Sequence, residues 1–227
     1  MVGPTYTRRM IEMEFEYPRL HKGRESYSEF LCGLVKQRRS SGKVLDIGCS
    51  YGYLLKKLEE NGFDTYGIDV SKESIEEAKK LTNAKLKVIS AEARLPFESD
   101  FFDVITMFDV IEHIKNYETS LKEAYRILKK KGLLLIITPN SRSILRFLLG
   151  KNWSWYKDPT HVNIFSEKRL RAMLKVIGFK NLNFKTFFNF YIAGETTEFL
   201  KIFRPLRRII FFPMIGDALF ISAEKNR

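Results

Sequence analysis

Short apolar runs alternate with amphipathic helical segments along the first two thirds of this chain, and this alternation leaves few possible folds. The apolar runs, each expected to form a buried strand, are residues 43–47, 65–70, 86–90, 102–108 and 132–138. The spacing of apolar residues predicts helices over 25–39, around 54–58, over 71–81, from just beyond Ile111, and over 121–128. Strands separated by helices form βαβ units, which assemble into a parallel sheet with right-handed crossovers.

The pattern changes after residue 140. One more helix is predicted over 166–177, with Ser166 as its N-cap and Gly178 as its stop. Two β-rich stretches, 181–190 and 217–224, contribute the last strands. The expected fold class is therefore α/β: a three-layer sandwich with a mostly parallel seven-stranded sheet and helices on both faces.

The 227 residues suffice for one such domain with a modest appendage. We expect residues 1–40 to form an N-terminal helical arm and residues 41–227 to form the domain itself. An apolar and basic insertion is expected near 195–216, where Arg204, Arg207 and Arg208 interrupt apolar residues.

The sequence predicts a cytoplasmic protein with no integral membrane segment. The best candidate span, residues 209–223, is short and is interrupted by Pro213 and Asp217. The N-terminus leads into acidic residues and lacks the apolar run of a signal peptide. Cys32 and Cys49 are the only cysteines and have no CxxC spacing, so no metal cluster is expected. A net charge of +12 is compatible with nucleic acid, an anionic membrane surface or an acidic substrate.

Candidate ligand-binding residues follow the first two predicted strands. Gly48 and Gly52 lie in the turn after residues 43–47, where missing side chains let the backbone approach a ligand. Asp46 precedes this turn, and Asp69 ends the second strand, where an acid commonly accepts hydrogen bonds from ribose hydroxyls. A NAD site would need G-x-G-x-x-G, but Ser50 interrupts that spacing, and Asp46 would repel a pyrophosphate. A cationic ligand suits these acids better.

Six segments in order closely resemble the motifs of class I S-adenosylmethionine-dependent methyltransferases, which have a Rossmann-like fold. They are residues 44–52, 66–71, 95–97, 102–105, 109–113 and 138–140. The stretch from His161 to Ser166, with Leu170, Leu174 and Gly178, is similar to the subgroup that includes ubiquinone-biosynthesis O-methyltransferases. The resemblance covers about residues 25–183 and implies S-adenosylmethionine as cofactor, with S-adenosylhomocysteine as product.

The resemblance also implies roles for individual residues. The loop formed by Asp46, Gly48, Cys49, Ser50 and Gly52 would hold the amino-acid end of the cofactor, with Ser50 expected to keep a negative φ. Asp69 would bind the ribose, and Val70 would contact the adenine. Glu92 and Ala93 would lie near the adenine amino group, although the family's acid stands one position earlier, where this chain has Ala91. Phe108 and Asp109 would face the methionine part and the acceptor, and the N-terminal arm would act as a lid.

Methyl transfer to a hydroxyl requires a general base, whereas a nitrogen or thiolate acceptor does not. His113 and His161 are the candidate bases, Glu112 competes with them, and His21 lies in the arm. Trp153, Trp155 and Tyr156 are aromatic residues that could wall an acceptor pocket or simply pack.

The expected function is methylation of a small-molecule or lipid-like acceptor, at oxygen. The apolar and basic segment 199–214 is interpreted as a cap on the acceptor site, a peripheral membrane contact, or an insertion packed on the sheet edge. RNA methylation and a catalytically silent cofactor-binding protein remain alternatives, and nucleic acid is not the favoured partner.

Overall fold

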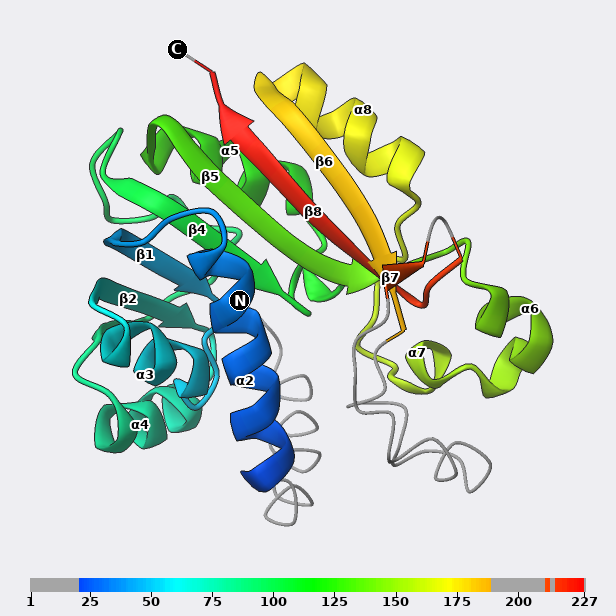
Figure 1. Ribbon diagram of the computed structural model, residues 1–227, viewed down its shortest axis with the longest axis horizontal. Helices are drawn as coiled ribbons and strands as arrows, with labels where there is room; N and C mark the ends of the chain where they lie inside the picture. The colour runs from blue at the N-terminus through cyan, green and yellow to red at the C-terminus, as the bar shows by residue number, and fades with distance from the viewer. Residues whose placement is uncertain (1–20, 189–210, 213–214, 227) are drawn as a thin grey trace.

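The computed structural model describes residues 21–188, 211–212 and 215–226 (Figure 1). One sheet runs through them in the order β3-β2-β1-β4-β5-β8-β6-β7. Its strands are β1 (Gly42–Ile47), β2 (Phe63–Asp69), β3 (Lys85–Val88), β4 (Phe102–Phe108), β5 (Leu128–Pro139), β6 (Phe179–Phe187), β7 (Phe211–Phe212) and β8 (Ala218–Lys225). The helices are α2 (His21–Lys36), α3 (Tyr53–Glu60), α4 (Lys72–Leu81), α5 (Tyr117–Ile127), α6 (Ile144–Leu149), α7 (Ser154–Lys157) and α8 (Glu167–Ile177), with 3-10 turns η2 (Ile111–His113) and η3 (Gly150–Asn152).

The sheet is parallel from β3 to β5 and antiparallel beyond it. The expected mostly parallel seven-stranded sheet is confirmed, and the two-residue β7 pairs with the end of β6 as an eighth strand. From β1 the chain proceeds outward to β2 and β3, and then returns to the other side of β1 to form β4. Adjacent strands whose connections leave in opposite directions create a crevice at their carboxyl ends, so a ligand site is expected between β1 and β4.

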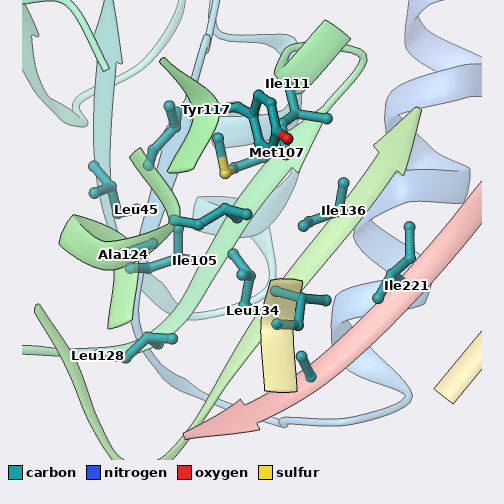
Figure 2. Packing of buried hydrophobic residues seen from close by; sticks show 14 of the residues in the cluster. Leu45, Ile105, Met107, Ile111, Tyr117, Ala124, Leu128, Leu134, Ile136 and Ile221 are labelled. Carbon is teal, nitrogen blue, oxygen red and sulfur yellow. The ribbon is translucent and has the colours of Figure 1, made fainter. Parts of the chain in front are cut away.

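Helices cover both faces of the sheet, as expected (Figure 1). Successive residues of β5 alternate between the two cores: Leu134 and Ile136 pack with α5 and α8, whereas Leu135 and Ile137 pack with α2 and α3. Figure 2 shows part of the first core, in which Ile105 and Ile136 are surrounded by buried side chains. Both faces of the central strands are thus removed from water, which explains their nearly continuous apolar sequences.

The predicted helix caps are present. The Ser71 hydroxyl accepts from the Ser74 amide at 3.1 Å, and the Ser166 hydroxyl accepts from the Arg169 amide at 3.3 Å. Gly178 ends α8 with a φ of 116°. Each cap satisfies helix-end groups that would otherwise have no partner within the helix.

Some predicted boundaries were wrong. Leu128 was assigned to a helix but begins β5, because the backbone becomes extended there and its side chain enters the core. The helix expected just beyond Ile111 is only the short turn η2, and α5 begins at Tyr117.

Residues 1–20 of the expected N-terminal arm lie outside the described residues. Residues 195–210 and 213–214 of the expected insertion near 195–216 also lie outside them. Among the described residues, no helix is long and apolar enough to cross a membrane.

Candidate active site

The loop after β1 contains three residues with left-handed backbone. Gly48, Ser50 and Gly52 have φ values of 77°, 45° and 78°. The expectation that Ser50 keeps a negative φ is therefore wrong. Its amide donates to Asp69 Oδ2 at 2.9 Å, and this hydrogen bond accompanies the left-handed backbone that non-glycine residues rarely adopt. At Gly48, an added Cβ would lie 2.3 Å from a Val110 methyl, so this position has no room for a side chain.

Asp69 joins this loop to the start of α4. Besides Ser50, its carboxylate accepts from the Ser71 amide at 2.8 Å. Burial raises the pKa of Asp69, and the backbone donors oppose that increase. A carboxylate has about four lone-pair positions, so these backbone bonds leave it able to accept from a further hydroxyl. The next residue, Val70, is 37% exposed and presents an apolar side chain at the same edge of the sheet.

Asp46 is a buried carboxyl beneath the loop. The Thr106 hydroxyl from β4 lies 2.6 Å from its Oδ1. Burial, and to a smaller extent the Asp69 charge, raise the pKa of Asp46 to about 7, against the lowering effect of the Thr106 bond. The site therefore holds a carboxyl group whose ionisation an approaching positive charge would favour.

A cavity lies between this loop and α2. Its lining residues come from α2, the loop after β1, α3 and the end of β4: Tyr27, Ser28, Leu31, Asp46, Gly48, Cys49, Ser50, Tyr51, Tyr53, Leu54 and Phe108. Five of the predicted site residues therefore meet at one cavity. The Cys49 thiol is buried, and burial together with Asp46 raises its pKa, so its contribution is its small size rather than thiolate chemistry.

Asp109 follows β4 with a φ of 56°. Its Oδ2 accepts from the Tyr27 hydroxyl of α2 at 2.8 Å, while its buried Oδ1 has no hydrogen-bond partner among the described residues. Burial raises the pKa of Asp109 to about 7; the Tyr27 bond lowers it and the nearby Asp217 raises it. The N-terminal helix is thus tied directly to the end of β4.

Glu112 is fully buried in η2. Its Oε2 accepts from the Thr138 hydroxyl at 3.0 Å, and its Oε1 has no partner among the described residues. Burial and then Asp109 raise the pKa of Glu112 well above its usual range. Its carbonyl accepts from the amides of Val162 and Asn163, both at 3.0 Å, which fastens the segment after β5 to the end of β4.

The two predicted catalytic histidines lie together. The rings of His113 and His161 have centroids 4.7 Å apart. His113 Nδ1 lies 2.8 Å from the Thr160 hydroxyl, which also contacts Asp158 Oδ1 at 2.5 Å. Burial and then His161 lower the pKa of His113 to about 4, so its imidazole is neutral near neutral pH.

The Asp158 carboxylate determines which tautomer His113 adopts. Burial acts to raise the pKa of Asp158, but the hydroxyl and amide of Thr160 outweigh it, so this pKa is lowered. An ionised Asp158 takes the single Thr160 hydroxyl proton, so His113 must donate from Nδ1 to Thr160 and keeps an acceptor lone pair on Nε2.

His161 is held differently. Its Nδ1 donates to the Trp155 carbonyl at 2.6 Å, and its Nε2 lies 3.6 Å from Asp158 Oδ2. The ligand-capable atoms of Glu112, His113 and His161 all lie within 4.8 Å of one another, close enough to contact one divalent cation. No metal cluster was expected because the cysteines lack CxxC spacing. That reasoning does not apply to a group made of a carboxylate and two histidines.

Glu92 and Ala93 lie apart from the cavity lining. The Glu92 carboxylate accepts from the Lys115 amide at 3.1 Å and from Asn116 Nδ2 at 2.8 Å, ahead of α5. The Ala93 amide donates to the Ser90 carbonyl at 3.1 Å. Glu92 therefore stabilises a turn.

The aromatic residues proposed as a pocket wall are also separate from the cavity lining. Trp153 and Trp155 are buried in the segment after β5, and Tyr156 is exposed.

Comparisons with known proteins agree with this geometry. A sequence profile described as a methyltransferase domain matches residues 19–183. This chain belongs to that methyltransferase family.

Its fold also matches that of a solved S-adenosylmethionine-dependent methyltransferase from Thermotoga maritima, described as a possible histamine N-methyltransferase. That match has a TM-score of 0.71 at 24% identity and covers 96% of this chain and 97% of the other. The family match over residues 19–183, together with this fold, makes the chain a class I methyltransferase with S-adenosylmethionine as its cofactor.

Two relatives show how far the similarity extends. A ubiquinone biosynthesis O-methyltransferase from Pelagibacter ubique is 29% identical over 182 residues, covering 70% of this chain and 75% of the relative. An uncharacterised protein of Methanocaldococcus jannaschii is 32% identical over 172 residues, covering 74% of this chain and 63% of the relative.

Sequence reasoning missed several residues of this methyltransferase site. Tyr27 was counted only as part of an apolar helix stripe, yet its hydroxyl reaches Asp109, 82 residues away. Thr106 and Thr160 appear in strand and loop sequences with nothing to mark them. Only the tertiary fold shows that each contacts a carboxyl or histidine. Glu112 was named as a competing base, and its complete burial is the new information.

Proposed function

We propose that this methyltransferase transfers the methyl group of S-adenosylmethionine to a hydroxyl oxygen of a small-molecule or lipid-like acceptor. The observation that carries the proposal is the half-buried His113, whose Nδ1 is held by the Thr160 hydroxyl at 2.8 Å, which leaves the lone pair on Nε2 to accept a proton. An oxygen acceptor needs such a base, whereas a nitrogen acceptor does not. The Pelagibacter relative, described as an O-methyltransferase, supports oxygen as the acceptor atom.

On the donor side, the loop and its two acids fit the cofactor. Asp69 would accept from the ribose hydroxyls while keeping its bonds to Ser50 and Ser71. Asp46, held by Thr106, would face the positively charged amino-acid end, which lowers its pKa and makes it ionise. The left-handed Gly48, with the other loop residues Cys49, Ser50 and Gly52, would let backbone amides approach the carboxylate of that end. Bound there, the cofactor supplies an activated methyl group on a sulfonium.

The adenine contact completes the donor side. Val70 offers an exposed apolar side chain beside Asp69. The Glu92 carboxylate already has two donors, so contact with the adenine amino group would require one of those bonds to open. We therefore assign the adenine contact to Val70, and keep Glu92 and Ala93 only as neighbours of that position.

On the acceptor side, Phe108 ends β4 and lines the cavity, Asp109 follows it directly, and His113 comes next in η2. His113 Nε2 would take the hydroxyl proton while the acceptor oxygen forms its bond to the methyl carbon and the carbon–sulfur bond breaks. The resulting imidazolium is stabilised through Nδ1, Thr160 and Asp158. His161, tied to Trp155 and Asp158, orients this group and is the second candidate base.

The direct test incubates the protein with S-adenosylmethionine and metabolite, lipid or RNA extracts, and measures S-adenosylhomocysteine. We expect product with the metabolite or lipid extract. Product with RNA alone would make the enzyme an RNA methyltransferase. No product with any extract, although calorimetry detects cofactor binding, would indicate a catalytically silent binder.

With an acceptor in hand, His113→Asn tests the base. We expect kcat to fall by about 10²–10⁴-fold with unchanged cofactor affinity. Thr160→Val is the matched variant: it removes the orienting bond but leaves the imidazole, so its loss in kcat should be smaller. Unaltered kcat in His113→Asn would contradict the assignment, and loss of activity in His161→Asn alone would move the base to His161.

A further inference from the structure

Helix α6 exposes apolar side chains that the fold does not use. Five of its six residues are apolar, and none of the six is buried. Phe147 is 77% exposed, Leu148 is 73% exposed and Ile144 is 40% exposed. In Figure 1, α6 and α7 lie outside the sheet, beyond the arrowhead of β5. Clustered large apolar side chains at the tip of a protruding helix indicate a contact surface rather than a scattered exception.

The base of this helix is firmly anchored, so the exposure is built into the structure. Asn140 Nδ2 donates to the Gly216 carbonyl at 2.7 Å, and its amide donates to the Asp217 carbonyl at 2.8 Å. The buried Ser143 caps α6 by accepting from the Leu145 amide at 3.1 Å. Just after α6, the buried Trp153 donates its amide to the carbonyl of Gly150, the C-cap of the helix, at 3.1 Å. The helix is therefore held between two fixed points with its apolar face outward.

The charge around α6 selects the kind of partner. Residues 141–153 contain three cationic side chains and no acidic one: Arg142, Arg146 and Lys151. Arg142 precedes α6 in the chain and Lys151 follows it, and both are exposed. Arg146 turns back to the Tyr156 hydroxyl and the Ser141 carbonyl. A second copy would bring two such positive surfaces together, which disfavours self-association through this face.

An anionic bilayer matches both properties at once. Apolar side chains of a short amphipathic element enter the boundary between headgroups and acyl chains, while flanking cations remain at the level of the lipid phosphates. We propose that Ile144, Phe147 and Leu148, flanked by Arg142 and Lys151, form a docking surface for the anionic face of a lipid bilayer. The docking does not depend on which acceptor the enzyme methylates, and it would bring the protein to lipid-like acceptors.

The proposal is tested by co-sedimentation of the full chain with phosphatidylcholine vesicles, with and without phosphatidylglycerol. We expect binding only to the anionic vesicles, decreasing with added salt. Phe147→Ser combined with Leu148→Ser should lower the bound fraction by roughly tenfold or more. Arg142→Gln combined with Lys151→Gln should also weaken binding.

Matched controls remove similar groups elsewhere. Val176→Ser removes another apolar side chain, 83% exposed on α8, and should leave vesicle binding unchanged. Lys122→Gln combined with Lys168→Gln removes two other exposed lysines. Thermal melting and S-adenosylmethionine calorimetry of every variant show that the fold and cofactor site persist, so a failure of docking is distinguishable from a failure of the enzyme.

Three outcomes would overturn the proposal. The wild-type chain could fail to bind anionic vesicles. The Phe147/Leu148 double variant could bind as well as the wild type, with binding lost instead when Arg204, Arg207 and Arg208 are changed to Gln. Or the chain could form concentration-dependent dimers that this double variant dissociates, which would make a second copy the occupant of α6.

Discussion

Replacing Asp46 with asparagine tests the electrostatics of the cofactor site. The asparagine side chain keeps an oxygen that can accept from Thr106, so the change removes the ionisable group with little change in shape. In the folded protein the pKa of Asp46 is raised from 3.8 to about 7. The folded state therefore holds a proton between these pH values that the unfolded chain has released. Stability contributed by this group is present below about pH 4 and is lost as pH rises toward about pH 7.

The magnitude follows from that pKa difference. At about 1.4 kcal/mol per pH unit, the change from 3.8 to about 7 corresponds to about 4 kcal/mol of unfolding free energy. We expect Asp46→Asn to become more stable relative to the wild type as pH rises, by up to this amount. Other buried acids, including Asp109 and Glu112, are present in both proteins, so their contributions largely cancel in the difference.

Urea denaturation of both apoproteins, followed by fluorescence at several pH values from about pH 4 to about pH 8, measures this difference. Glu118→Gln, which removes an exposed carboxylate on α5, controls for the change in net charge. Stability curves for wild type and Asp46→Asn that stay parallel across this range would refute the buried-acid interpretation.

The same variant tests the proposed cofactor contact. Binding of a cation beside Asp46 should release a proton below about pH 7, so the affinity of the wild type for S-adenosylmethionine should increase with pH. In Asp46→Asn this pH dependence should largely disappear, and affinity should fall by at least about tenfold because the positive end loses its partner. Calorimetry in buffers of different ionisation enthalpy measures the released proton.

Three further changes have defined expected effects. Ser50→Gly should be more stable than Ser50→Ala by about 1 kcal/mol in urea denaturation, because only glycine adopts the observed φ of 45° without strain; equal stabilities would argue against the left-handed loop. Tyr27→Phe should lower the unfolding free energy by about 1–3 kcal/mol above pH 7, since ionised Asp109 loses a buried donor. An unchanged urea midpoint would argue against this contact. Asp69→Ala should abolish S-adenosylmethionine binding in calorimetry, and retained affinity would withdraw the ribose assignment.

Much of the fold was predictable because apolar periodicity and helix caps are local signals. The expected strand 102–108 coincides with β4, and Ser166 and Gly178 bound α8 as expected. Leu128 was misplaced because an apolar residue fits both the end of a helix and the start of a buried strand. Only its pairing with Phe102 across the sheet decides between them.

Within the site, the gathering of acids and glycines at the carboxyl ends of β1, β2 and β4 was predictable, because parallel strands bring their ends to one edge. The positive φ of Ser50 was not, since it accompanies a hydrogen bond to Asp69 on another strand. The partners of Glu92 were not predictable for a similar reason, since Lys115 and Asn116 come from a turn far along the chain.

The sequence by itself determined the α/β class, the cofactor and the positions of the candidate acids and histidines, since these depend on residue type and on order along one chain. The tertiary structure decided which of those groups are charged and which are held in place. Burial and neighbours from distant segments set the pKa values of Asp46 and His113, and they left the apolar face of α6 in solvent. Both are properties of the packed chain, because desolvation and exposure do not exist until the elements assemble.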